Sequence, residues 1–241
     1  MLTLPNYSKA TLLAAFFFLH TMYNNNAQAD TETNLTTSTQ SSQNSSHKVN
    51  STYTIEKTTP NKDENTTTLI VKTLQNTVNL TLPLMVNGHT LPPKPDKSVN
   101  DSTLLGVDVN DNGVRDDVER WIYKTYKDKH PIHIDIAMQA ARAWQKVLEN
   151  PSKAKELYPI VDAPSYCESY YKIYAKYFNE KVLINEDITN EFFREKIIFN
   201  TLERKKAYLE YDKLLSGDSY TTPKIGDGKK LCDFNTSKYE E

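Results

Sequence analysis

The stretch from Asp108 to Glu119 constrains this chain more than any other, because its spacing leaves few ways to fold it. Counted from Asp108, oxygen-bearing side chains stand at positions 1, 3, 5, 9 and 12, and glycine stands at position 6. This is the calcium-loop pattern D-x-[DN]-x-[DN]-G-x5-E. Calcium takes about six to eight oxygen ligands, which a short loop supplies by turning alternate side chains inward. The spacing predicts a metal site with the ligands Asp108, Asn110, Asn112, the carbonyl of Val114, Asp116 and Glu119.

The predicted ligand set also bounds the affinity of the loop. Three ligands are carboxylates and two are neutral amides, which favours modest affinity, at the weak end near about 10⁻⁴–10⁻³ M that is typical of extracellular sites. Gly113 permits the sharp turn because it has no Cβ. The alternative is an Asn/Asp-rich turn that only caps the next helix, with Asp116 and Asp117 at the positive end of the helix dipole. The complete set of ligand positions favours calcium.

The loop resembles the EF-hand-like calcium loops of thrombospondin type 3 repeats and dockerins. A longer run, from Leu91 to Arg120, resembles a group of uncharacterised exported proteins of Gram-negative bacteria. The first resemblance implies a bound calcium ion, and the second implies export without implying an activity.

Two features separate the stretch from a paired EF-hand sensor. The prolines at 92, 93 and 95 leave no room for a full entering helix. Arg115 occupies loop position 8, where an apolar residue normally pairs with a second loop, and the sequence has no second loop. We therefore expect a single structural clamp rather than a calcium switch.

Residues 1–29 have the pattern of a signal peptide. Lys9 precedes an apolar run over residues 10–19, and Ala27-Gln28-Ala29 follows as a cleavage site. The run is too short to span a membrane. We expect cleavage near Ala29 and export to the periplasm or the medium, with no transmembrane span in the mature chain. The formal net charge of −2 argues against nucleic acid as a partner.

The next two segments differ in composition. Residues 30–68 are rich in Ser, Thr, Asn and Gln and poor in aliphatic residues, so we expect a disordered tether, with an O-glycosylated stalk as the alternative. Residues 69–97 contain β-favouring runs and the dipeptide Asn87-Gly88, which is typical of a type I′ turn. They predict a short β hairpin or extended segment.

Residues 98–241 predict the calcium loop followed by a helical domain, so the fold class is mainly α. Val118, Trp121, Ile122 and Tyr126 share one helical face, and Pro131 ends that helix. Three further helices are expected at about 134–149, 165–179 and 188–215. Ser165 and Glu168 have capping-box spacing. The sequence thus predicts a four-helix domain entered through a single EF-hand-like loop.

Cys167 and Cys232 are the two cysteines of the chain. In an exported protein an even pair favours a disulfide, here one that pins the Gly-rich tail to the helices. A catalytic thiol is the functional alternative.

Other candidate sites are weaker. His130 and His133 flank a helix break but lack a third zinc ligand nearby in the sequence. The run from Glu203 to Lys206 is typical of a solvated helix face. A tyrosine stripe is compatible with either a binding platform or the core; its members are Tyr166, Tyr170, Tyr174 and Tyr177.

Three functions remain compatible with the sequence. We expect an exported, non-catalytic protein in which calcium stabilises the entry to a helical domain. The first alternative is a module that uses the helical face to bind a cell-envelope polymer or another protein. The second is a hydrolase, for which the sequence offers no catalytic pair and no nucleophile elbow, P-loop or H-E-x-x-H motif.

Overall fold

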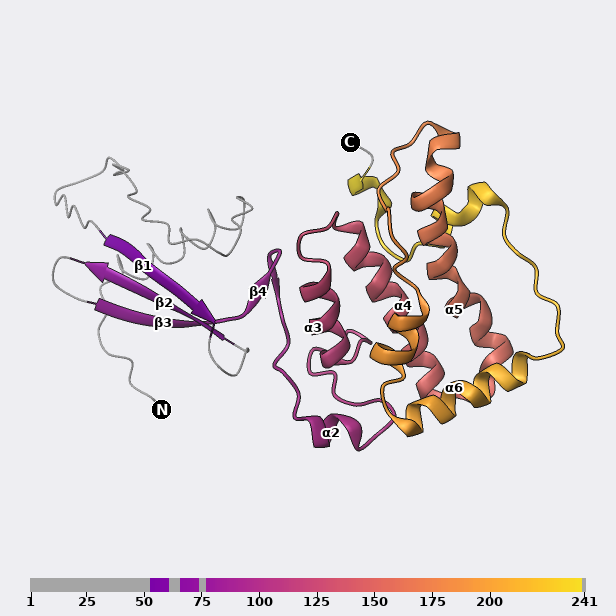
Figure 1. Cartoon of the computed structure of the whole chain (residues 1–241), viewed down its shortest axis with the longest axis horizontal. Coiled ribbons are helices and arrows are strands. Elements are labelled where there is room, and N and C mark those ends of the chain that lie inside the picture. Colours follow the sequence, from indigo (N-terminus) through magenta and orange to yellow (C-terminus); the bar gives the residue numbers. More distant parts are fainter. Residues whose placement is uncertain (1–52, 61–65, 74–76, 240–241) are drawn as a thin grey trace, which may run out of the picture. The chain divides into compact units, whose positions relative to one another are not determined.

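The computed structural model describes residues 53–60, 66–73 and 77–239 (Figure 1). The chain divides into two compact units, one up to Thr90 and one from Leu91 onward. The predicted signal peptide and residues 30–52 of the predicted tether lie outside the described residues.

The first unit contains a three-stranded antiparallel sheet. Its strands pair in the order β1-β2-β3, and the register of the β1–β2 pair shifts between Ile55 and Lys57. Residues 53–60 and 66–68 fall within the predicted tether, so for them the prediction of disorder was wrong. Threonine is β-branched and is favoured in strands. A prediction based on the low aliphatic content therefore missed that this Thr-rich segment forms paired strands. The strands are β1 Tyr53–Pro60, β2 Thr66–Thr73 and β3 Thr77–Pro83.

A small hairpin follows the sheet. β4 Met85–Val86 pairs with β5 His89–Thr90. Both turn residues have positive φ, 50° at Asn87 and 74° at Gly88, which is the requirement of a type I′ turn. The predicted turn is confirmed.

The second unit is mainly helical, as predicted. Pro131 precedes α4 and Pro151 follows it, so both prolines separate helices as the sequence indicates. The α-helices are α2 Lys97–Asp101, α3 Asp116–Thr125, α4 Ile132–Glu149, α5 Ala154–Ser169 and α6 Leu202–Leu215. The shorter π and 3₁₀ helices are η1 Pro151–Lys153, η2 Tyr170–Tyr174, η3 Ala175–Phe178, η4 Phe193–Ile198, η5 Ile225–Leu231 and η6 Thr236–Tyr239.

Helix α4 lies at the centre of this unit and packs against α3, α5, α6 and η4 (Figure 1). Much of its length is buried, and three of its buried side chains are Ile132, Ile136 and Val147. Small residues such as Ala137 and Ala140 are also buried there, which leaves room for neighbouring helices. The core thus forms around α4.

Two predicted helices have different bounds in the structure. The expected helix over 188–215 is interrupted, since η4 ends at Ile198 and α6 begins at Leu202, capped by the Thr201 hydroxyl. The expected helix over 165–179 instead begins at Ala154 and passes through two prolines.

The capping box was also wrong. The Glu168 carboxylate lies near the end of α5 and accepts hydrogen bonds from the backbone N–H groups of Ile188 (2.9 Å) and Thr189 (2.8 Å). It therefore holds a distant loop rather than the start of its own helix.

The predicted disulfide is confirmed. Cys167 and Cys232 are joined with an S–S distance of 2.00 Å. Cys167 lies near the end of α5, and η5 packs on the same helix. At Gly228 a Cβ would lie 2.7 Å from the carbonyl oxygen of Tyr166, so the tail can approach α5 this closely only as glycine.

Candidate metal centre

The predicted calcium loop connects α2 to α3. Its first ligands lie in the loop, and Asp116 and Glu119 lie in the first turn of α3. Both of these side chains are fully buried. Among the predicted ligands, Glu119 in the first turn of α3 meets Asn110 and Asn112 of the loop through hydrogen bonds.

The predicted ligands also shape the loop. The Asp108 carboxylate accepts from the backbone N–H groups of Asn112 (3.3 Å) and Gly113 (2.9 Å). Asn112 Oδ1 accepts from the N–H of Val114 at 2.8 Å. Gly113 has φ +77°, the left-handed conformation in which glycine is favoured. The turn thus depends on the residues that the calcium pattern specifies.

Asp116 is the most constrained carboxylate of the site. Its Oδ1 accepts from the N–H of Val109 at 3.1 Å. Its Oδ2 is buried and has no hydrogen-bonding partner among the described residues. The pKa of Asp116 is raised to about 6, chiefly by burial and in smaller part by the negative charges of Asp108 and Glu119. A cation at this position would relieve both effects.

Glu119 faces the two predicted amide ligands. Its Oε2 accepts from Asn110 Nδ2 at 3.2 Å and from Asn112 Nδ2 at 2.7 Å. The amides therefore present nitrogen to the carboxylate, and half a turn of each amide would present oxygen instead. With the amides turned, every predicted ligand would offer an oxygen atom to the metal, as calcium requires.

The described residues do not contain a ready-made group of three or more His, Cys, Asp or Glu side chains that could hold a metal. Only three of the predicted loop ligands are acidic, and in this arrangement Asp108 is engaged with backbone N–H groups. The predicted ligands are of the chemical type that calcium binds. Binding requires the side-chain amides of Asn110 and Asn112 to rotate so that their oxygen atoms face the ion.

Arg115 has a role that the sequence did not reveal. Its side chain is buried, and Nε donates to Asp117 Oδ1 at 2.6 Å. Its Nη1 and Nη2 donate to the carbonyl oxygens of Ile198 (3.1 Å) and Ile197 (3.0 Å). Arg115 thus ties the start of α3 to the end of η4.

Arg204 was predicted to lie on a solvated face, and that prediction was wrong. The side chain is fully buried. It donates to the carbonyl oxygen of Leu104 (2.9 Å), to Asp101 Oδ1 (3.2 Å) and to Asn200 Oδ1 (2.7 Å). It also donates to the carbonyl oxygens of Asn100 and Thr103. Arg204 on α6 therefore holds the segment that leads into the calcium loop.

Gly106 gives a first testable prediction. It has φ +69°, and a Cβ there would lie 2.2 Å from Cδ of the buried Arg115. We expect Gly106→Ala to lower the free energy of unfolding by about 2–3 kcal/mol, because backbone strain and overpacking add. Gly113→Ala is the matched control: its φ is +77°, but the nearest atom would lie 3.6 Å away, so only about 1 kcal/mol of strain is expected.

Urea unfolding in the presence of a chelator measures both variants without a contribution from calcium. Equal losses of stability in the two variants would contradict the close packing of Arg115 against Gly106.

The histidine pair and the tyrosine stripe that the sequence singled out each combine residues that differ in burial. His133 is buried, with Nδ1 2.8 Å from the carbonyl oxygen of His130 and Nε2 3.7 Å from Glu186 Oε1. Tyr170 is buried in the core, whereas Tyr177 is 69% exposed. The tyrosines of the stripe therefore do not form one continuous platform.

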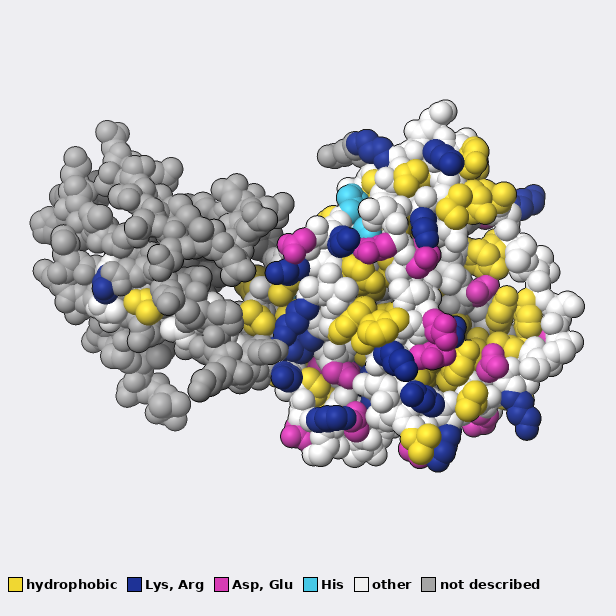
Figure 2. All heavy atoms as spheres, viewed as in Figure 1, with side chains coloured by type: hydrophobic (Ala, Val, Ile, Leu, Met, Phe, Trp, Pro, Cys, Tyr) yellow, Lys and Arg dark blue, Asp and Glu magenta, His cyan; other side chains and the backbone are white. Residues whose placement is uncertain are grey.

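The surface of the helical unit carries both signs of charge. Figure 2 shows positive, negative and hydrophobic side chains interspersed on the face in view. None of the helices in the described part of the chain combines the length and hydrophobicity needed to cross a membrane.

Comparisons of the chain with protein-family models, with curated proteins and with solved structures found no match.

Proposed function

We propose that this chain is an exported, non-catalytic calcium-binding protein in which the ion stabilises the entry to the helical unit. The observation that carries the proposal is the buried Oδ2 of Asp116, which has no hydrogen-bonding partner among the described residues. It occurs at the ligand positions of a complete calcium-loop pattern. Export is supported by the signal-peptide pattern and by a disulfide, which persists in oxidising compartments.

The proposed ion would be held by Asp108, Asn110, Asn112, Asp116, Glu119 and the carbonyl oxygen of Val114. Because these ligands come from both the loop and the first turn of α3, the ion would fasten one to the other. Arg115 and Arg204 join the same segment to η4 and α6. We therefore propose that an EF-hand-like loop leads into a domain built on the four longer helices. In this loop, calcium would add a third link to the two that Arg115 and Arg204 make.

The experiment is a thermal melt of the wild-type chain with calcium and with chelator. At about 10 mM calcium, roughly ten to a hundred times the expected dissociation constant, linkage stabilises the folded state by about 1.4–2.7 kcal/mol. For a chain of this size the melting temperature should rise by about 3–10 °C.

Glu119→Gln should abolish most of this rise, because calcium loses a bidentate carboxylate. Glu156→Gln is the matched control, since Glu156 is an exposed glutamate in the first turn of α5. An unchanged melting temperature of the wild-type chain in calcium would refute the proposal, as would an equal rise in Glu119→Gln.

A further inference from the structure

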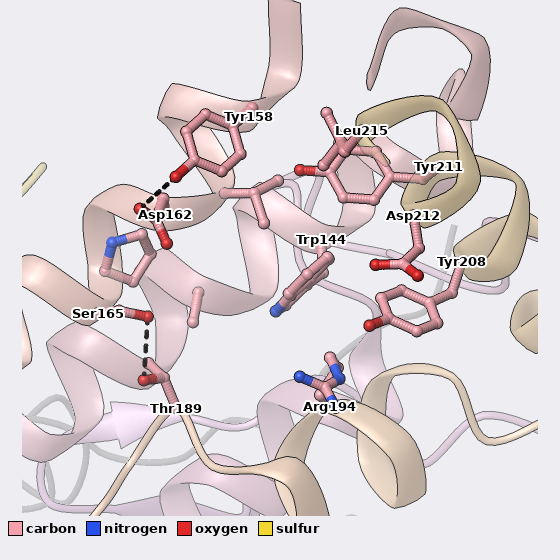
Figure 3. Close-up of a pocket in the computed structure, with 13 residues that line it drawn as sticks. Trp144, Tyr158, Asp162, Ser165, Thr189, Arg194, Tyr208, Tyr211, Asp212 and Leu215 are labelled. Carbon is pink, nitrogen blue, oxygen red and sulfur yellow. Dashed lines mark hydrogen bonds between the residues drawn. The ribbon is translucent and has the colours of Figure 1, made fainter. Parts of the chain in front are cut away.

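A cavity of about 210 Å³ opens in the helical unit away from the predicted calcium ligands, none of which lines it. Its walls come from four elements: α4 with Trp144, α5 with Asp162, η4 with Arg194, and α6 with Tyr208 and Tyr211 (Figure 3). Residues nearly 70 positions apart in the sequence therefore meet at one site.

The apolar part of the wall is aromatic. The Trp144 ring stands edge-on to Tyr208 and Tyr211, with centroid distances of 5.9 Å and 6.0 Å. Tyr158 lines the opposite side and is backed by Tyr220 at 3.9 Å. Flat faces that also carry polar tips suit a ligand with both an apolar face and polar edges.

Two polar groups at the cavity have no hydrogen-bonding partner among the described residues. One is the hydroxyl of Tyr211, whose side chain is only 3% exposed, and the other is the buried Nε of Arg194. Figure 3 shows the Tyr211 hydroxyl on the Tyr158 side of the Trp144 ring, and the indole nitrogen on the side that faces Thr189 and Arg194. Buried groups of this kind are costly unless a partner satisfies them, so a ligand that pairs with them at the cavity would remove that cost.

The charges in the cavity are mixed. Asp162 accepts from the Tyr158 hydroxyl at 3.2 Å, and Asp212 lies near the mouth. The Arg194 guanidinium lies over the Tyr208 ring, 5.3 Å from its centroid. The guanidinium disfavours a simple cation, and the two carboxylates disfavour a simple anion. A neutral ligand with several donors and acceptors fits both conditions.

We propose that this cavity binds one saccharide ring, as a free sugar or as the terminal unit of a larger glycan. Its hydroxyls donate to Asp162 and Asp212 and accept from Tyr211 and Arg194, and its C–H face lies against the aromatic wall. The volume is smaller than the roughly 300–1,000 Å³ of pockets for drug-sized ligands, which limits the ligand to about one ring. This binding is separate from calcium and adds a second ligand to the protein.

The test is a titration of the full chain with methyl glycosides of glucose, galactose, mannose and N-acetylglucosamine, followed by tryptophan fluorescence and ligand-observed NMR. We expect at least one glycoside to bind. Tyr211→Phe should weaken that binding about tenfold, the effect of one lost hydrogen bond of about 1.4 kcal/mol. Asp212→Asn should also weaken it, because a neutral amide oxygen is a poorer acceptor than a carboxylate.

The controls separate binding from folding. Tyr177→Phe makes the same chemical change on an exposed tyrosine and should leave binding unchanged. Tyr211→Phe should retain the wild-type melting temperature, because it removes a hydroxyl that has no hydrogen-bonding partner among the described residues. Asp212 is exposed, so its variant remains informative if the first fails to fold. Glu119→Gln should still bind the glycoside.

Three results would overturn the proposal. The first is the absence of binding by every glycoside in the panel. The second is undiminished binding in both Tyr211→Phe and Asp212→Asn. The third is preference for a zwitterionic amino acid, tested with glycine and tyrosine, which would assign the cavity to a different class of ligand.

Discussion

Arg204→Met is expected to lower the free energy of unfolding by about 3–5 kcal/mol, the usual cost of breaking a buried charged network by removing one partner. Methionine preserves much of the apolar stem but donates no hydrogen bonds. Asp101 would lose its partner on α6, and the carbonyl oxygens of Asn100, Thr103 and Leu104 would lose their donor. Denaturation in urea measures the change.

The matched control is Lys206→Met, two residues further along α6. The Lys206 side chain is 60% exposed and pairs with Glu203 on the same helix, so its loss should cost about 0.5 kcal/mol or less. Hydrogen exchange should also show earlier opening at Val107, whose N–H donates to Asn100 Oδ1 at 3.0 Å. A stability loss in Arg204→Met no larger than that of the control would contradict the role of Arg204 in holding the segment before the calcium loop against α6.

Reduction of the Cys167–Cys232 disulfide is expected to lower the free energy of unfolding by about 4 kcal/mol. The bridge spans 65 residues, and in the chain-entropy model the loss reflects the freedom that the unfolded chain regains. Because reduction keeps both sulfur atoms in place, comparison of oxidised and reduced wild type isolates the covalent link from the packing of the buried Cys167.

The tail keeps other contacts with α4 after reduction. Gln139 donates to the carbonyl oxygen of Leu231 at 2.7 Å, and Arg142 pairs with Asp233 at 2.8 Å. We therefore expect a folded reduced protein in which the N–H groups of η5 exchange faster than those of α4. Equal stability of the two forms in urea would contradict a structural role for the bridge.

The turn at Gly113 and the disulfide could be predicted from the sequence, whereas calcium binding by the loop stays a prediction. A loop of fixed spacing fixes its own turn, as Asp108 and Gly113 show, and two cysteines allow one intramolecular pairing. The same holds for the Asn87-Gly88 turn, where the residues themselves set the backbone conformation.

Long-range partners could not be predicted in the same way. Arg204 looks like part of a solvated charge run because its neighbours in sequence are charged, but its partners lie about 100 residues away. Pro159 and Pro164 suggest helix ends, yet α5 passes through both. Glu168 has capping-box spacing but binds the backbone at Ile188. In each case tertiary contacts override a local rule.

No pattern in the sequence predicted the cavity. Trp144, Asp162 and Arg194 belong to three elements whose proximity depends on the packing around α4. Sites of this kind become visible only when the fold assembles them.

Calorimetric titration of the chain with calcium tests the central claim most directly. We predict one ion per chain, a dissociation constant at the weak end, near about 10⁻⁴–10⁻³ M, and loss of the binding heat in Glu119→Gln but not in Glu156→Gln. Absence of saturable binding by the wild-type chain, or equal binding by Glu119→Gln, would contradict the assignment of Asp108–Glu119 as a calcium site.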